Sequence, residues 1–293
     1  MDSLYISTIW RGVRWEDSGI IWKVNLGTYE IVDKFYINRS EMVIPPNSEK
    51  AGHRSIRGMC FWSGDFWVGG YNFIAKINPN EFSIVEIYFS DECMDIHNIY
   101  SSEEGIVVTS TLNNSIFVFD GTEFNKVVDL TNVFPNNNTK PDTLHLNSLC
   151  EGLALLCTYE NAHSAIVNIE AGKVLFTDDK FVHAHDLVYI KSGEIITNSS
   201  VDQKVLAIDL YGGTFRVLFD YRKYNPGKDS DIAKWGWLRG LYYDGKSDTL
   251  FVGTSPASVL IFRDVSNDIS LEKDISLSED VNMAVFDIIA GVA

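Results

Sequence analysis

The sequence predicts a six-bladed β-propeller that takes up residues 1–293 as one domain. Short runs rich in Val, Ile, Phe, Tyr and Thr alternate with clusters of Gly, Asn, Asp and Pro, which is typical of strands joined by turns. No stretch keeps a helical hydrophobic period over about 11 residues. A unit of four such runs returns every roughly 40 to 50 residues, which is the length of one propeller blade.

Five complete units follow one another along the chain. Each begins with the run that is expected to line the central channel and continues through three further strands. In the first unit the four runs begin at Arg57, Asp65, Asn72 and Ser83. The five units cover residues 57–88, 97–129, 147–176, 185–219 and 239–272.

A sixth unit is divided between the two ends of the sequence. Residues 4–10, 19–26 and 29–37 supply three strands but no leading one, and the run from Ala284 to Ile289 resembles that missing strand. We expect this run to pair with the N-terminal strands, because closing the ring removes an exposed sheet edge. Without this pairing the propeller would have five blades.

The composition restricts the partners that the chain can have. With 45% hydrophobic and 22% charged residues, the chain is far from the composition of disordered proteins. Its net charge of −16 opposes nucleic acid and anionic lipid, so neither is expected as a partner. No apolar run approaches the roughly 18 residues of a membrane helix, and the first residues do not resemble a signal peptide. We therefore expect a cytoplasmic protein without membrane contact.

The four cysteines do not follow a metal-binding or disulfide spacing. They form no CxxC pair, and three of them lie in apolar, strand-like runs. We expect buried free thiols, because free cysteine is among the most buried residue types and a disulfide framework is typical of small secreted domains. The cysteines are Cys60, Cys93, Cys150 and Cys157.

Alignment of the six channel-lining strands gathers polar residues at one mouth of the channel. The position just before each apolar core holds Arg57, His97, Asn147, His185, Arg239 and Phe286. Two residues earlier, and facing the same way because strand side chains alternate, stand Ser55, Asp95, His145, His183, Trp237 and Ala284. Four of the six histidines of the chain fall into these positions, so we expect the functional site here.

The residue types at this mouth predict a site for an anion. Arg57 and Arg239 offer planar forks for a carboxylate or phosphate. His97, His145 and His185 are the candidate catalytic residues, since histidine transfers protons near neutral pH. Further candidate contacts to a substrate are Asn147, His183, Trp237 and, from a long turn that should overhang the mouth, Arg11.

A divalent metal is the competing interpretation of the same histidines. His97, His145 and His185 come from three successive units, and three imidazoles with an open position suit zinc, iron or manganese. The nearby arginines would oppose a cation electrostatically. The sequence leaves the cofactor undecided between none and one such ion.

The channel-lining strands resemble the signature segments of a bacterial propeller family whose activity is unknown. The segments here are Asp95-Ile-His97-Asn, His145-Leu-Asn147-Ser-Leu, His183-Ala-His185-Asp and Trp237-Leu-Arg239-Gly-Leu. They are similar to that family's Asp-Ile-His, His-Leu-Asn-Gly-Leu, His-rich and Arg-Gly-Leu segments, but Ser148 stands where glycine is expected and His-Ala-His where a proline-histidine is expected. The resemblance implies the propeller fold and a functional face at the mouth, and no particular reaction.

A more distant similarity links the architecture to the lactonase and strictosidine-synthase propellers. The metal-binding acidic residues of those propellers have no clear equivalents in this sequence, and a shared fold does not carry a function with it.

Three functions remain open from the sequence. The first is an enzyme of lyase or epimerase type that acts on a small anionic substrate such as a sugar acid, a sugar phosphate or a nucleotide sugar. The second is a metalloenzyme with histidine ligands. The third is a non-catalytic scaffold that binds a glycan or peptide across the mouth. No GxSxG, GxxxxGKS/T or HExxH motif points to other chemistry.

Overall fold

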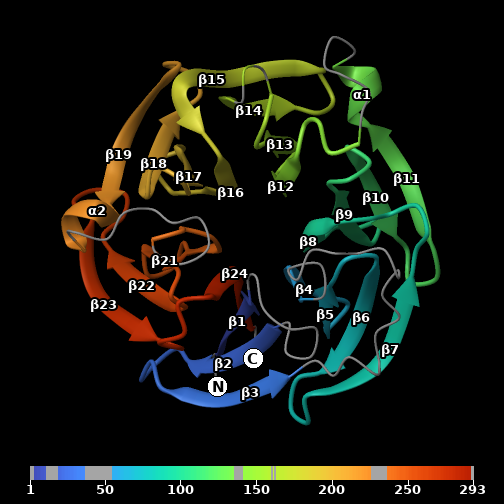
Figure 1. The fold of residues 1–293 in the computed structure, drawn as a ribbon, viewed down its shortest axis with the longest axis horizontal. Coiled ribbons are helices and arrows are strands. Elements are labelled where there is room, and N and C mark those ends of the chain that lie inside the picture. Colours follow the sequence, from blue (N-terminus) through green and yellow to red (C-terminus); the bar gives the residue numbers. More distant parts are fainter. Residues whose placement is uncertain are drawn as a thin grey trace.

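The computed structural model describes residues 3–10, 19–36, 55–134, 141–159, 161, 163–225 and 236–291. In this part of the chain, six antiparallel sheets of four strands each stand in a ring (Figure 1). The predicted six-bladed β-propeller is confirmed. Each sheet has one strand near the central axis and one at the rim.

The strands follow the chain from the axis to the rim in every blade. Blade 1 consists of β24 (Met283–Gly291), β1 (Ser3–Trp10), β2 (Gly19–Asn25) and β3 (Ile31–Tyr36). Blade 2 consists of β4 (Gly58–Trp62), β5 (Asp65–Gly69), β6 (Phe73–Asn78) and β7 (Ser83–Phe89). Blade 3 consists of β8 (Ile96–Ser101), β9 (Ile106–Ser110), β10 (Ser115–Phe119) and β11 (Phe124–Asp129).

The remaining blades repeat this order. Blade 4 consists of β12 (Leu146–Cys150), β13 (Leu153–Leu156), β14 (His163–Asn168) and β15 (Lys173–Val182). Blade 5 consists of β16 (Ala184–Tyr189), β17 (Ile195–Ser199), β18 (Lys204–Asp209) and β19 (Thr214–Asp220). Blade 6 consists of β20 (Leu241–Asp244), β21 (Thr249–Gly253), β22 (Ser258–Arg263) and β23 (Ser270–Ser276).

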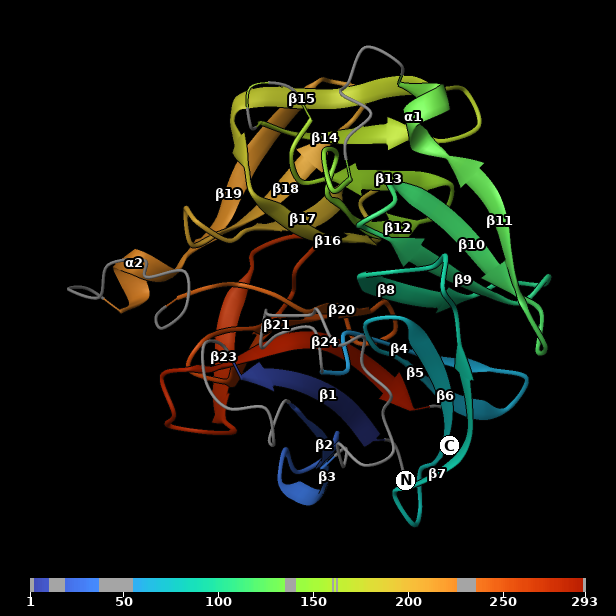
Figure 2. The same ribbon diagram turned by 45° about the vertical axis from the view of Figure 1, so that its right-hand side comes forward.

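Blade 1 closes the ring as the sequence predicted. The strand β24 pairs antiparallel with β1, with Ser7 opposite Asp287 and Ile9 opposite Ala284. The two strands lie side by side in the turned view as well (Figure 2). The five-blade alternative is therefore wrong.

Two helices of a single turn follow outer strands. They are α1 (Leu130–Val133) and α2 (Tyr221–Tyr224). Each is capped by the last residue of the strand before it, because the Asp129 and Asp220 carboxylates accept hydrogen bonds from the backbone N–H groups two residues on.

The hydrophobic core is divided among the six interfaces between neighbouring blades. In β5, for example, Trp67 packs with blade 3, whereas Phe66 and Val68 on the opposite face pack with blade 1. This alternation explains why the middle strands read as continuous apolar runs: both of their faces are covered by the adjacent blades. The propeller is thus held together by packing between sheets and leaves the polar residues of the inner strands at the axis.

Short polar side chains join the inner strands of successive blades. The Asp186 carboxylate accepts from the Gly240 backbone N–H at 2.8 Å, and the Asp287 carboxylate accepts from the Met59 N–H at 2.8 Å. In blade 2, Gly58 occupies the corresponding position, where a Cβ atom would lie 2.7 Å from the backbone nitrogen of Ile99. Glycine after an arginine in these strands therefore permits close approach of the next blade.

Candidate functional site

The six aligned positions of the inner strands come together in the structure. We call them the channel hexad: Arg57, His97, Asn147, His185, Arg239 and Phe286. All six side chains are buried. The Phe286 ring lies between the two arginines, with its centroid 5.7 Å from Arg57 Cζ and 4.6 Å from Arg239 Cζ.

The residues that precede the hexad adopt an uncommon backbone conformation in three successive blades. Asp95, His145 and His183 have positive φ angles of 57°, 45° and 47°. Their carbonyl oxygens accept hydrogen bonds from the N–H groups of the first residues after the second strands, Thr111, Cys157 and Ser200, at 3.2, 3.1 and 3.2 Å. Left-handed backbone costs a non-glycine residue about 1 kcal/mol or more, and these hydrogen bonds hold it in place.

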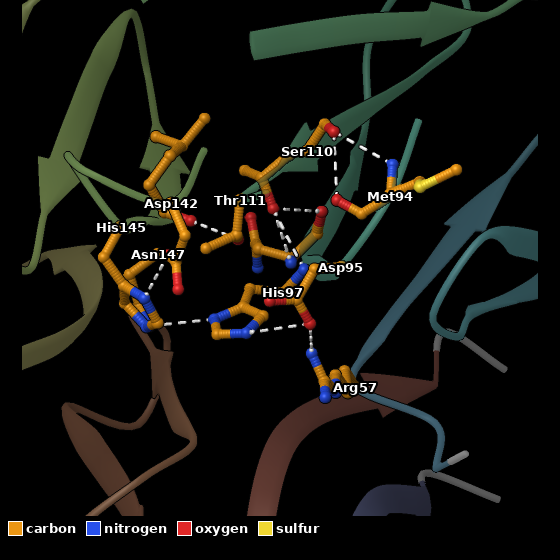
Figure 3. Close-up of polar contacts among 12 residues, drawn as sticks. Arg57, Met94, Asp95, His97, Ser110, Thr111, Asp142, His145 and Asn147 are labelled. Atoms are coloured by element: carbon orange, nitrogen blue, oxygen red, sulfur yellow. Dashed lines mark hydrogen bonds and ion pairs between the residues drawn. The ribbon is translucent and has the colours of Figure 1, made fainter. Parts of the chain in front are cut away.

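Arg57, Asp95 and His97 form one half of the site (Figure 3). The guanidinium of Arg57 donates to Asp95 Oδ1, and the same oxygen lies 3.7 Å from His97 Nε2. The turn before Asp95 is fixed by Ser110, whose hydroxyl accepts from Met94 N–H at 2.9 Å and donates to the Met94 carbonyl at 3.0 Å. The charge of Arg57 is therefore already matched by a carboxylate.

His97 is held as a neutral imidazole. Burial lowers its pKa to about 3, although the neighbouring Asp95 carboxylate opposes the shift. The Nδ1 atom of His97 lies 3.4 Å from the amide nitrogen of Asn147, which is a donor, so Nδ1 carries the lone pair and Nε2 the proton. Asn147 also accepts from the Asp186 N–H at 3.1 Å through its oxygen, which fixes the orientation of its amide.

His145 stands at the mouth beside His97 (Figure 3). The two ring centroids are 4.9 Å apart, with the rings nearly perpendicular. His145 Nδ1 lies 2.7 Å from Asp142 Oδ1, and since a carboxylate only accepts, Nδ1 donates. The Nε2 atom of a neutral His145 then carries the lone pair.

His185 has a defined tautomer. The Ser200 hydroxyl donates its hydrogen to the Leu238 carbonyl at 2.6 Å, so its oxygen, 2.8 Å from His185 Nδ1, must accept. The carbonyl of His183 accepts from the same Nδ1 at 2.9 Å. The proton therefore resides on Nδ1, and Nε2 accepts from Arg239 Nη2 at 2.5 Å. Burial and then the charge of Arg239 lower the pKa of His185 well below its ordinary value.

Arg239 differs from Arg57 in its partners. It is 7% exposed, and it makes none of the ion pairs found among the described residues. Its Nε atom is buried without a hydrogen-bond partner in that part of the chain. The guanidinium lies over the rings of Phe286 and Trp237, 4.6 and 5.1 Å from their centroids. Burial lowers the pKa of Arg239 to about 10, which leaves a cation at neutral pH.

Two other candidate contacts have structural surroundings that the sequence did not indicate. His183 precedes β16 in left-handed backbone, so strand alternation does not fix the direction of its ring, and its carbonyl holds His185 and Ser200. Trp237 is buried and packs its indole against Arg239 and His185. Arg11, the remaining candidate, lies outside the described residues.

One cluster among the described residues can hold a metal ion. The ligand atoms of His145, Cys157 and His185 all lie within 4.8 Å of one another. From the sequence, the two histidines group with His97, and Cys157 is expected to be a buried thiol. Cys157 is indeed buried, and burial raises its pKa to about 12.

Three further residues of this site do not follow from the alignment of the inner strands: Asp142, Cys157 and Ser200. Asp142 is three residues before His145, a spacing that offered a signal. Cys157 and Ser200 each follow a second strand, which places them at the mouth beside the start of the inner strand. This position becomes recognisable only once the second strands are aligned in the same way as the first.

The described residues contain no helix with the length and apolar character that crossing a membrane requires. No protein-family model matches the chain, and no curated protein matches it.

Solved structures show the same fold at low sequence identity. A chain of a nidogen–laminin complex matches with a TM-score of 0.64 and 11% identity, over 100% of this chain and 99% of that chain. A protein of unknown function from Bacteroides caccae matches with a TM-score of 0.58 and 8% identity, over 99% and 98%. The WD40 repeats of RRP9 match with a TM-score of 0.52 and 13% identity, over 88% and 74%. At these identities the comparisons establish a β-propeller and no activity.

Proposed function

We propose that this protein is an enzyme that binds a small anionic substrate at the channel hexad and transfers protons with its histidines. The observation that carries the proposal is Arg239, a buried cation that forms no ion pair with any described residue. Asp186 acts on Arg239 electrostatically, but a buried charge without a directly bonded counter-charge is costly. A carboxylate or phosphate group supplies that counter-charge and matches the planar guanidinium fork.

The hydrogen bond between Arg239 and His185 supports a mechanism for proton transfer. Arg239 Nη2 donates to the His185 Nε2 lone pair. An oxyanion is a stronger acceptor than imidazole for a guanidinium, so a bound anion draws Nη2 away from His185. The released lone pair can then remove a proton from the carbon beside the anionic group, while Arg239 stabilises the charge that develops on the substrate.

We assign the second proton transfer of such a reaction to His97 or His145. His97 belongs to the hexad, and His145 stands edge to face with it and is partly open to solvent. Donation of a proton by one of these histidines to the opposite face of the substrate carbon, while His185 keeps the proton that it removed, gives an epimerase. Departure of a leaving group from the neighbouring carbon instead gives a lyase. The substrate classes that fit are sugar acids, sugar phosphates and nucleotide sugars, because each carries an anionic group and an acidifiable carbon or leaving group.

Anion binding is tested by substituting Arg239. We expect hexuronates, hexose phosphates or uridine diphosphate sugars to raise the denaturation temperature of the native protein. Arg239→Met should lower the affinity for the best anion about 30-fold or more, whereas Arg216→Met should not, because Arg216 is exposed and paired with Glu194 at 2.8 Å. The Met variant should fold, since it removes a buried unpaired charge. A panel that stabilises both proteins equally, or neither, overturns the proposal.

Proton transfer is tested with His185→Gln. Glutamine keeps an acceptor for Arg239 but cannot take up a proton. For an anion that binds, we expect the native protein to incorporate deuterium from heavy water into the substrate, and the variant to bind without exchange. Mass spectrometry of the recovered substrate measures this. If the native protein binds the anion without deuterium exchange, the catalytic part of the proposal is wrong and the protein only binds anions.

A non-catalytic propeller is the second candidate, favoured by the burial of the hexad. His185 is 3% exposed and Arg57 5%, so the polar centre also suits a structural plug. The similar chain in the nidogen–laminin complex belongs to a protein assembly. On this alternative a peptide or glycan binds across the mouth, and Arg239→Met leaves binding of that partner unchanged.

A further inference from the structure

Blades 3, 4 and 5 carry equivalent residues directly after their second strands. In blade 3 the Thr111 hydroxyl donates to the Leu146 carbonyl at 2.6 Å, and in blade 5 the Ser200 hydroxyl donates to the Leu238 carbonyl at 2.6 Å. Each hydroxyl thus joins its blade to the inner strand region of the next one. Blade 4 has Cys157 at this position, and a thiol is a weak donor that cannot replace such a hydrogen bond. A hydrogen bond between blades therefore does not explain why blade 4 has a cysteine at this position.

The thiol of Cys157 instead faces two imidazoles. Its sulfur and one nitrogen each of His145 and His185 lie within 4.8 Å of one another. With zinc bonds of about 2.0–2.1 Å to nitrogen and 2.3 Å to sulfur, tetrahedral ligands stand about 3.5 Å apart. Side-chain rotations that shift the three atoms by about 1 Å therefore close the cluster around one ion.

Both imidazoles already have the outer partners that metal-bound histidines need. His145 donates through Nδ1 to the Asp142 carboxylate at 2.7 Å. His185 donates through Nδ1 to the His183 carbonyl and Ser200 hydroxyl. Metal-ligating histidines usually donate their second nitrogen to a carboxylate or carbonyl, which fixes the tautomer and ring orientation. In each ring this leaves Nε2 as the ligand atom.

We infer that His145, Cys157 and His185 form a site for one borderline-soft divalent metal ion, zinc being the best fit. Two imidazoles and a thiolate select zinc, cobalt or copper over magnesium and calcium. Three protein ligands leave a fourth position for a substrate atom, as in catalytic zinc sites. The assignment rests on the proposed function for the nature of that fourth ligand, an anion held by Arg239. With the ion bound, the Nε2 lone pair of His185 is a metal ligand, so proton removal by His185 belongs to the metal-free protein.

Arg239 sets a condition on metal binding. Its Nη2 donates to His185 Nε2, the lone pair that the ion needs, and its charge repels a cation. Binding of the ion therefore requires the guanidinium to turn away. Arg239→Met removes both obstacles and should raise the affinity for the ion about tenfold or more, the opposite of its effect on the anion.

The test is titration of the full chain, freed of metal and of any histidine tag and kept reduced, with Co²⁺. One equivalent should produce the intense near-ultraviolet absorption of a thiolate–cobalt bond. Cys157→Ser should abolish this band and still fold, because Ser and Thr occupy the same position in blades 5 and 3. Cys150→Ser and His97→Gln are the matched controls and should keep the band.

Each result has a defined meaning. Visible d–d bands of bound cobalt that are kept in Cys157→Ser and lost in His97→Gln, without the near-ultraviolet thiolate band in the native chain, overturn the assignment in favour of the three-histidine set. Absence of any cobalt band at one equivalent overturns it outright. Anion binding by Arg239 is measured separately on the metal-free chain, so failure of the metal site and failure of the proposed function are distinguishable.

Discussion

At the scale of single residues, a buried neutral imidazole at the channel makes the stability of the protein depend on pH. His97 is 8% exposed, and its pKa is lowered to about 3, chiefly by burial. The free histidine side chain titrates near 6.5. Its neutral form therefore contributes stability that is complete above about pH 6.5 and is lost as the pH falls towards the folded-state value.

The substitution His97→Gln should flatten the acid side of the stability profile. Below pH 6.5 the native protein loses up to about 1.4 kcal/mol per pH unit at this residue, because the unfolded chain takes up a proton that the folded chain does not. Glutamine does not titrate, so the variant should lose less free energy of unfolding between pH 6.5 and 4. Urea denaturation at several pH values measures the difference. Parallel profiles for the two proteins would contradict a buried, neutral His97.

Asp287 should have the opposite effect on the same profile. Burial, and next the Asp186 carboxylate, raise its pKa to about 7. A raised carboxyl pKa gives stability at low pH that is lost as the pH rises from about 4 through 7. The free energy of unfolding of Asp287→Asn, relative to that of the native protein, should therefore rise by about 2 kcal/mol between pH 5 and 8. Asp33→Asn, on an exposed strand, is the control, and an equal pH trend in all three proteins would refute the shift.

At the scale of strands, the residues between neighbouring inner strands set the spacing of the blades. Where the inner strands are far enough apart, Asp186 and Asp287 bridge them by accepting backbone hydrogen bonds. Where they come closer, glycine takes the same position, as at Gly58. Glycine in the Arg-Gly pairs is thus a packing feature.

Gly58→Ala should disturb the contact between blades 2 and 3. The added Cβ would lie 2.7 Å from the Ile99 backbone nitrogen, and backbone cannot move aside cheaply. We expect a loss of about 1–3 kcal/mol in the free energy of unfolding. Gly245→Ala is the matched control, since its Cβ meets nothing closer than 3.7 Å. Equal stability of the two variants in denaturant titration would contradict this account.

The sequence was sufficient for the strand order and for the channel hexad because both depend on a repeat. The 40- to 50-residue period and the apolar cores can be aligned without coordinates. The cluster of His145, Cys157 and His185 could not be predicted in this way, since Cys157 lies after a second strand and meets the histidines only across the mouth. His183 was also misleading, because its left-handed backbone breaks the alternation that places strand side chains.

At the scale of the whole molecule, the ring depends on one strand from the far end of the chain. β24 pairs with β1 and supplies Met283, Val285 and Ile288 to the core between blades 1 and 6. It also provides Phe286 to the hexad and Asp287 to the contact with blade 2. Ring closure, the core between blades 1 and 6, and the channel hexad therefore all depend on β24.

Removal of residues 281–293 should abolish cooperative unfolding. The truncated chain exposes the edge of β1 and leaves one interblade core incomplete, so we expect a loosely packed, aggregating product. A peptide of residues 281–293, fused to a solubility tag, should restore the cooperative transition when mixed with it, and the same peptide with Phe286→Asp should not. A truncated chain that unfolds as cooperatively as the native protein would show that closure is dispensable.

The pairing of β24 with β1 also orders events during synthesis. The strands β1, β2 and β3 leave the ribosome before the other described strands, but their sheet lacks its inner strand until residues 283–291 have been made. Blades 2 to 6 are contiguous and can fold as they emerge. Strands β1 to β3 are thus made before blades 2 to 6 but reach their native structure after them, and chaperone demand should be concentrated on these strands during that interval.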